Sequence, residues 1–550
     1  MTEAAVLNLA NLPDWEDIKN KAELIQRLET EVLPPYVNTC RWFAGKARQP
    51  IRFQLRQIHP VPVGSSVAYL TILGVEYSEG DAENYLLPLG LLESDQPEAR
   101  DIPPKGIMAK VKLGNGRGLL IDAMYDERFR EMLYGFMASQ HTLAGPDGDL
   151  QFLRGRGLAE EDLNTRLPSR VLPVDSSNSA LVFGNKYFVK LYRKLFSETN
   201  PEVETVSFIT EHSNFDHIPA YAGSVVLKQE GAPDVTLVMM QLMVENRKDS
   251  WDLTGDYLND FLYQVPQRMF SIREEVFDMV ELLGQRTGEL HCALYNQHAG
   301  PEFAPEPFTD EYREFIIGRI EHLLEGRYNL LIDNYTRLDP LAQRLAWVFM
   351  EAKELIDDFV ADFRCRPIES LRIRIHGDYH LGQVLATQND FVIIDFEGEP
   401  ESSITERKIK HSPLKDVAGM VRSYHYAVSA KLFGSAETAG IEADQLQRVS
   451  DRWFKLIRDT FMDAYLETIG SPHPLFKDNA EINFLLLIYL LEKAVYELGY
   501  EISYRPHWVK IPLKGIVDVI REIEKIRIAD GNLTNEGRGL PTGLLQTKKA

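Results

Sequence analysis

From about residue 250 onward the chain is predominantly helical, and one short β unit interrupts these helices. The helical pattern comes from apolar residues that recur every three or four positions. The interruption consists of two predicted strands, at residues 372–375 and 391–394. We expect these two strands to pair, which would bring the polar residues that follow them to one end of a small sheet.

The first 243 residues are richer in strands. A cap is predicted over residues 1–105, ending in an acidic, proline-bearing connector. Residues 106–243 read as strands, a helix and further strands, the order of a kinase-like small lobe. Residues 244–530 form the helical large lobe, and 531–550 a polar tail. The expected fold class is therefore α+β, with two lobes and an N-terminal α+β cap.

Composition narrows the possible functions. The formal net charge is −22, and an acidic surface repels phosphate backbones, so nucleic-acid binding is not expected. The three cysteines, Cys40, Cys292 and Cys365, form no disulfide framework and favour a reducing, cytoplasmic location. The strongest apolar run, residues 484–491, is too short to span a membrane.

The strongest motif for chemistry lies around the predicted β unit. Residues 375–383 read IHGDYHLGQ, and residues 391–399 read FVIIDFEGE. Phosphoryl transfer needs a carboxylate that accepts the proton of the attacking hydroxyl, a role that suits Asp378. It also needs oxygen ligands for Mg²⁺, and Gln383 and Asp395 can supply them. Gln383 follows Asp378 by five positions, the spacing of the kinase catalytic loop, but it replaces the usual asparagine.

The two histidines of this motif have different expected roles. His376 is expected to brace the loop through hydrogen bonds. For His380 a structural role and a contact with substrate both remain open. The alternative to catalysis is that His-Gly-Asp is a plain turn and Ile-Ile-Asp a strand that ends in a helix cap. The combination of both halves at kinase spacing favours catalysis.

A second candidate is Lys190, which lies inside an apolar predicted strand. A lysine there is costly without a partner. In a kinase small lobe such a lysine meets the ATP phosphates and pairs with a helix glutamate. Glu202 and Glu204 lie on the helix that begins at Asn200 and Pro201, and we favour Glu204. The alternative is a lysine on a solvated sheet edge.

Two further segments complete the predicted nucleotide site. A serine-rich turn at residues 175–179 can present N–H groups and hydroxyls to phosphate. The connector after the last small-lobe strand would offer its backbone to adenine, unless it only links the lobes. The predicted ATP contacts are Lys190, Glu204, Ser176, Ser177, Asn178, Ser179, Gln241 and Met243.

Together these motifs resemble the maltokinase family of the aminoglycoside-phosphotransferase fold. The resemblance rests first on residues 376–385 and 391–400, and it extends across nearly the whole chain. Further matches occur at residues 41–46, 175–179, 189–191, 286–291, 303–308, 412–420, 493–497, 505–506 and 511–513.

The resemblance implies transfer of the γ-phosphate of ATP, with Mg²⁺, to the anomeric hydroxyl of maltose. It also implies a place beside trehalose synthase in α-glucan metabolism. Sugar recognition would then come from the large lobe, through His380 and one face of a helix. The residues of that face, spaced at helical intervals, are Lys493, Tyr496, Glu497, Tyr500 and Glu501.

Alternatives remain open. The helix face is equally typical of a packing stripe with charged ends. A glucosamine kinase or another sugar kinase would share the chemistry of Asp378, Gln383 and Asp395 and differ around residues 493–505. A catalytically silent partner subunit of trehalose synthase is a third possibility, which the presence of Lys190, Asp378 and Asp395 disfavours.

Overall fold

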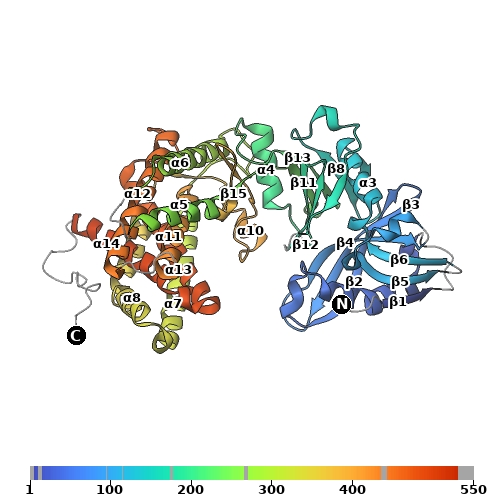
Figure 1. Ribbon diagram of the computed structural model, residues 1–550, viewed down its shortest axis with the longest axis horizontal. Coiled ribbons are helices and arrows are strands. Elements are labelled where there is room, and N and C mark those ends of the chain that lie inside the picture. The colour runs from blue at the N-terminus through green and yellow to red at the C-terminus, as the bar shows by residue number, and fades with distance from the viewer. Residues whose placement is uncertain are drawn as a thin grey trace. The chain divides into compact units, whose positions relative to one another are not determined.

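The computed structural model describes residues 5–9, 15, 17–94, 96–113, 116–173, 177–265, 271–434 and 442–529. The chain forms two compact units (Figure 1). The first comprises residues 1–244 with 403–405, and the second comprises residues 245–402 with 406–550. The predicted boundary after residue 243 lies one residue from this division. Ser176 and the predicted tail lie outside the described residues.

The first unit begins with a sheet that forms the cap. Its order is β1-β5-β6-β4-β3-β2, and β12 pairs with β4. Two short helices, α1 (Ala22–Arg27) and α2 (Leu33–Thr39), contribute Leu24, Leu33 and Val37 to the buried core beside it. The strands are β1 (Ala5–Leu9), β2 (Pro50–Val63), β3 (Ser66–Tyr77), β4 (Glu83–Glu93), β5 (Ile107–Leu113), β6 (Gly116–Asp122) and β12 (Lys194–Leu195).

The predicted end of the cap at residue 105 is too early, because β5 and β6 belong to the same sheet as β2–β4. The proline-bearing connector that suggested a boundary forms short 3₁₀ turns at Pro97–Arg100 and Pro104–Gly106. Proline and acidic residues mark loops inside a domain as readily as boundaries between domains.

A second sheet in the first unit has the order β7-β8-β13-β14-β11-β10-β9. Strands β10 and β11 form a hairpin, and Gly184 and Asn185 in its turn both have positive φ, as the tight turns of hairpins commonly do. The strands are β7 (Thr142–Leu143), β8 (Asp149–Arg154), β9 (Ser169–Val171), β10 (Ser179–Phe183), β11 (Tyr187–Leu191), β13 (Tyr221–Lys228) and β14 (Val235–Leu242). Helices α3 (Glu127–Ala138) and α4 (Pro201–His212) accompany them.

A buried ion pair joins the two sheets of the first unit. Arg193, between β11 and β12, donates to Asp122 at the end of β6 across 2.5 Å. Both side chains are 1% exposed. Arg193 also donates to the carbonyl of Leu86 and to the hydroxyl of Ser179. The cap sheet is therefore tied directly to the hairpin that carries Lys190.

The second unit is mainly helical, as predicted. Its long helix α13 contributes a nearly continuous buried face and contacts α7, α11 and α14. The helices are α5 (Ser250–Gln264), α6 (Glu274–Leu294), α7 (Asp310–Asn334), α8 (Pro340–Glu351), α9 (Lys353–Cys365), α10 (Ile404–Arg407), α11 (Leu414–Gly434), α12 (Ala443–Ile469), α13 (Asn479–Tyr504) and α14 (Lys510–Ala529). Across the described ranges, none of the helices is both long and apolar enough to cross a membrane.

The small β elements of this unit pair differently from the prediction. β19 (Phe391–Ile393) pairs with β18 (Val384–Ala386), and β18 pairs with β15 (Lys248–Asp249). The predicted strand at 372–375 contributes only β17 (Leu371–Arg372), which pairs with β16 (Glu306–Pro307). The predicted pairing of 372–375 with 391–394 is therefore wrong. Ile373 bridges to His411 instead, and a three-residue strand, β18, takes the place beside β19.

Candidate active site

Backbone hydrogen bonds fix the loop that carries Asp378. Asp416, near the start of α11, accepts from the backbone N–H groups of His376 at 2.7 Å and Gly377 at 2.9 Å. Gly377 has a φ of 87°, a conformation that favours glycine. The ring of His376 meets the carbonyl of Ile394 at 2.9 Å and lies 4.7 Å from the ring of Phe396. The bracing role predicted for His376 agrees with these contacts.

Asp416 is itself held by two buried side chains from other helices. His291 on α6 approaches Asp416 Oδ2 through Nε2 at 3.3 Å, and Tyr465 on α12 meets His291 Nδ1 at 3.0 Å. Burial alone would raise the pKa of Asp416, but the hydrogen bond and the charge of His291 outweigh it and lower that pKa. The loop therefore rests on a buried hydrogen-bonded chain that sequence reasoning missed.

The carboxylate of Asp378 is partly exposed and lies beside a cation. Lys493 Nζ is 3.3 Å from Asp378 Oδ1, and His380 Nε2 is 3.9 Å from Oδ2. Burial lowers the pKa of His380, although the charge of Asp378 opposes this. An accessible carboxylate with a neighbouring ammonium can accept a proton from a bound hydroxyl.

Asp395 lies at the same end of the small sheet as this loop. In the β18–β19 register Val384 is opposite Ile393, and the backbone N–H of Ile394 donates to the carbonyl of Gln383. The Gln383 amide nitrogen donates to Asp395 Oδ2 at 3.1 Å. Asp395 has a φ of 68°, a strained conformation for a residue other than glycine. Gln383 and Asp395 therefore lie close together, as expected, but the strand that pairs with β19 to bring this about is β18 and not residues 372–375.

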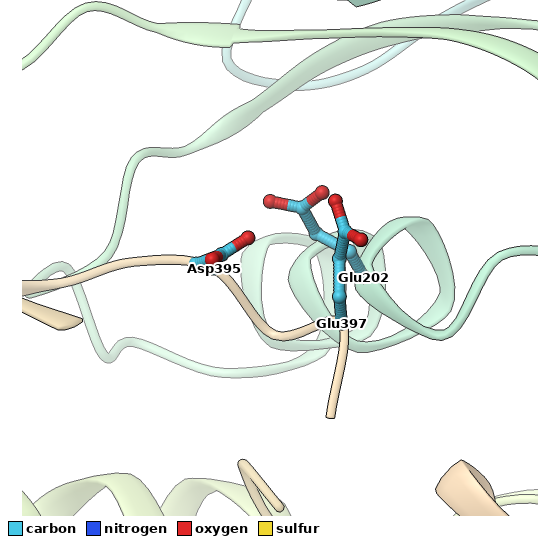
Figure 2. Close-up of side chains that lie close together, drawn as sticks. All are labelled: Glu202, Asp395 and Glu397. Carbon is cyan, nitrogen blue, oxygen red and sulfur yellow. The ribbon is translucent and has the colours of Figure 1, made fainter. Parts of the chain in front are cut away.

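A second carboxylate accompanies Asp395. Figure 2 shows Asp395 and Glu397 on the segment that follows β19, and their carboxylate oxygens lie within 4.8 Å of each other. Hard oxygen ligands of this kind, with the Gln383 carbonyl beside them, fit Mg²⁺. Sequence reasoning did not assign Glu397, which lies in a turn after β19 and not on the strand itself.

The first unit places Lys190 against a buried glutamate. Lys190 Nζ lies 2.7 and 2.9 Å from the two carboxylate oxygens of Glu202. The hydroxyl of Tyr192 donates to the same carboxylate at 2.8 Å. Figure 2 shows Glu202 on α4. The preference for Glu204 as the ion-pair partner is therefore wrong: Glu202 on α4 is completely buried, whereas Glu204 is half-buried. Two residues are about 200° of helical rotation, which turns Glu204 to another face.

The other predicted nucleotide contacts are only partly available. The hydroxyl of Ser179 accepts from Arg193 at 2.8 Å, and Ser177 is exposed with the half-buried Asn178 between them. Gln241 is buried and pairs in register with both neighbouring strands. The backbone N–H of Met243 donates to the carbonyl of Lys186, so only its carbonyl oxygen remains for the predicted adenine contact.

The predicted sugar face of α13 divides into two parts. Lys493 contacts Asp378, its ammonium lies 5.4 Å from the ring centre of Tyr496, and Tyr500 is 43% exposed. Glu497 and Glu501 instead face the interior of the unit: Glu497 binds Arg422, and Glu501 binds Tyr426 and Arg505. The geometry therefore assigns Glu497 to an ion pair with α11, and Glu501 to a hydrogen bond with α11 and an ion pair at the end of its own helix, as a packing stripe would.

An ionic cluster beside Asp378 was not predicted. Glu399 binds Lys493 at 3.2 Å and Arg319 at 2.8 Å, and Arg319 also binds Glu492 at 2.6 Å. Burial would raise the pKa of Glu399, but Lys493, Lys415 and Arg319 lower it to about 2. These groups line a cavity of about 20 Å³ together with Gly377, room for roughly one water molecule. These charged residues lie far apart in the sequence, so no local motif indicated that they form a cluster.

The chain is similar to known proteins in its cap and along much of its length. Residues 36–126 match the Maltokinase N-terminal cap domain. A glucosamine kinase of Streptacidiphilus jiangxiensis is 25% identical over 361 residues, which is 64% of this chain and 74% of that protein. A glucosamine kinase of Mycolicibacterium smegmatis is 25% identical over 349 residues, 62% of this chain and 77% of that protein.

A solved structure has the same fold. A glucosamine kinase in complex with glucosamine, ADP and inorganic phosphate superposes with a TM-score of 0.62 and 18% identity. The match covers 88% of this chain and 98% of that one. The fold and the site together define a kinase-like phosphotransferase of mixed α+β class, as predicted. Within that class, the chain carries a maltokinase-type cap over residues 36–126.

Proposed function

We propose that this chain transfers the γ-phosphate of ATP to a sugar hydroxyl, with the anomeric hydroxyl of maltose as the acceptor. One observation carries the proposal. The partly exposed carboxylate of Asp378 lies beside Lys493, and Asp395 with Gln383 lies at one end of the β18–β19 pair. A proton acceptor and a set of oxygen ligands for a cation are the two elements that phosphoryl transfer requires.

The residues have distinct roles in this proposal. Asp378 accepts the proton of the acceptor hydroxyl and orients it, while Lys493 holds one oxygen of that carboxylate. Asp395, Glu397 and Gln383 would hold Mg²⁺, which neutralises charge on the phosphates. Lys190, fixed by Glu202, would bind phosphate oxygens of the nucleotide. Asp416 keeps the loop in place and does not contact substrate.

Two observations support maltose as the acceptor. The cap matches the domain that maltokinases carry. Tyr496 and Tyr500 follow Lys493 along one face of α13, so aromatic rings extend roughly 10 Å from Lys493 at 1.5 Å per residue. Sugar rings pack on aromatic faces, and this length suits an acceptor of two sugar units.

A second candidate is phosphorylation of glucosamine. It is favoured by the two relatives and the solved structure, all of which are glucosamine kinases. The match of the cap favours maltose as the acceptor, whereas the relatives favour glucosamine, and the phosphotransfer chemistry is the same for both. A partnership with trehalose synthase remains a prediction from the family resemblance.

A coupled ADP-release assay across maltose, glucose, glucosamine and trehalose tests the proposal. We expect Mg²⁺-dependent turnover with maltose, and Asp378→Ala should abolish it while ATP still binds. Turnover on glucosamine with none on maltose would favour the second candidate. No sugar-dependent ADP release by the wild-type protein would contradict kinase function and favour a silent subunit.

A further inference from the structure

Lys493 places a positive charge directly beside the proposed proton acceptor. Its Nζ lies 3.3 Å from Asp378 and 3.2 Å from Glu399. Its side chain is 24% exposed, and it lines the small cavity together with Gly377 and Tyr496. Burial lowers the pKa of Lys493, but Asp378 and Glu399 raise it above its ordinary value. The side chain of Lys493 therefore carries its positive charge at neutral pH.

Two carboxylates near Lys493, those of Glu399 and Glu492, are also bound by other cations. Glu399 binds Arg319 as well as Lys493. Glu492 binds Arg319 at 2.6 Å and lies 3.7 Å from Lys415. A cationic ligand entering here would have to displace Lys493 from Asp378 or Glu399, or else stand beside it.

We propose that Lys493 makes the acceptor site selective for neutral sugars over amino sugars. The inference rests on the proposed sugar kinase function and adds the charge class of the acceptor. An acceptor hydroxyl that reaches Asp378 brings its neighbouring ring substituents close to Lys493. A neutral hydroxyl there can accept a hydrogen bond from the ammonium. A sugar ammonium can only donate and is repelled, and such repulsion is a common source of specificity.

The test compares two acceptors within each variant. The wild type, Lys493→Met and Lys493→Arg are assayed with glucosamine and with the neutral sugar that the wild type uses best. The ratio of the two kcat/KM values cancels any general loss of folding or catalysis. We expect the wild type to prefer the neutral sugar by more than about tenfold, Lys493→Met to reduce that preference at least about tenfold, and Lys493→Arg to retain it.

The wild-type protein supplies an independent measurement if the methionine variant does not fold. Raising the pH neutralises the amine of glucosamine, so kcat/KM for glucosamine should rise relative to that for the neutral sugar. Equal use of both sugars at neutral pH, or the same preference in Lys493→Met as in the wild type, overturns the role of Lys493 and leaves the kinase function standing. Absence of turnover with every sugar overturns both.

Discussion

Gln383 donates its side-chain amide to the carboxylate of Asp395, although twelve residues separate them in the chain. The bond crosses the end of the β18–β19 pair, where the backbone of Ile394 also donates to Gln383. Asp395 is thus held in its left-handed conformation, with φ at 68°, from both its side chain and the adjacent backbone. In the proposed enzyme this contact sets the direction of a metal-binding carboxylate.

Replacing Gln383 should therefore weaken the use of metal and nucleotide together. Gln383→Leu removes both the bond to Asp395 and a carbonyl ligand, and we expect kcat/KM for ATP to fall about 10- to 100-fold. Steady-state kinetics at several Mg²⁺ concentrations would show the loss as a higher Mg²⁺ requirement. Gln383→Asn keeps the amide one methylene shorter and should fall between leucine and wild type. Wild-type Mg²⁺ dependence in the leucine variant would remove Gln383 from the metal site.

The site residues that sequence could predict are those whose relationship is local. Gln383 follows Asp378 by five residues, and Asp395 follows β19, which pairs with the strand that begins directly after Gln383, so a short stretch of chain brings all three near one another. The pairing of the strands was misjudged because β18 has only three residues, too few to show an alternating pattern. The chemistry was predictable even though the sheet that carries it was not.

The supporting residues could not be predicted, because they come together only by folding. Glu399 and Arg319 are 80 residues apart and lie on different elements. His291, on α6, reaches Asp416 from 125 residues away. Glu399, His291 and Asp416 are polar but buried, and a sequence pattern places polar residues at the surface. The cap boundary failed for a related reason, since strand pairing decided that β5 and β6 belong to the first sheet.

Asp416 should affect turnover more than nucleotide binding. Asp416→Asn replaces one acceptor oxygen with an amide group, which would face a backbone N–H donor of His376 or Gly377. Leaving such a buried donor unsatisfied costs about 1–3 kcal/mol. We expect kcat to fall at least about tenfold while KM for ATP changes less than about threefold.

His291→Leu, which removes the support of Asp416 without touching the loop, should show the same split in milder form. Steady-state kinetics and thermal unfolding would be measured together for both variants. A parallel rise in KM for ATP would indicate a general disturbance of the unit instead of a displaced loop.

Glu399 should make the free energy of unfolding depend on pH in the acidic range. Its pKa is lowered from 4.5 to about 2 in the folded protein, a difference that corresponds to about 3 kcal/mol. A lowered pKa stabilises the fold fully above the ordinary value, so this contribution is lost as the pH falls from about 4.5 toward 2.

Urea unfolding of the wild type and Glu399→Gln between pH 7 and pH 3 would reveal this contribution. The variant should be less stable at pH 7, and the two free energies of unfolding should converge as the pH falls. Glu401→Gln, an exposed neighbour two residues away, is the matched control and should differ from the wild type by a constant amount. A constant difference for Glu399→Gln as well would mean that its carboxylate contributes no such linkage.

The two glutamates of α4 offer a matched pair for the nucleotide site. Glu202→Gln removes the buried carboxylate that holds Lys190 and accepts from Tyr192, so the partly buried ammonium loses the contact that fixes its position. We expect ATP affinity, measured by isothermal titration calorimetry, to fall at least about tenfold, because a displaced ammonium no longer meets the phosphates. Glu204→Gln changes the same charge two residues away on another face of the helix, and affinity should stay within about threefold of the wild type. Thermal unfolding of both variants separates a local effect from a loss of the fold. If Glu204→Gln weakens ATP binding as much as Glu202→Gln does, the ion pair between Lys190 and Glu202 is not what positions the lysine.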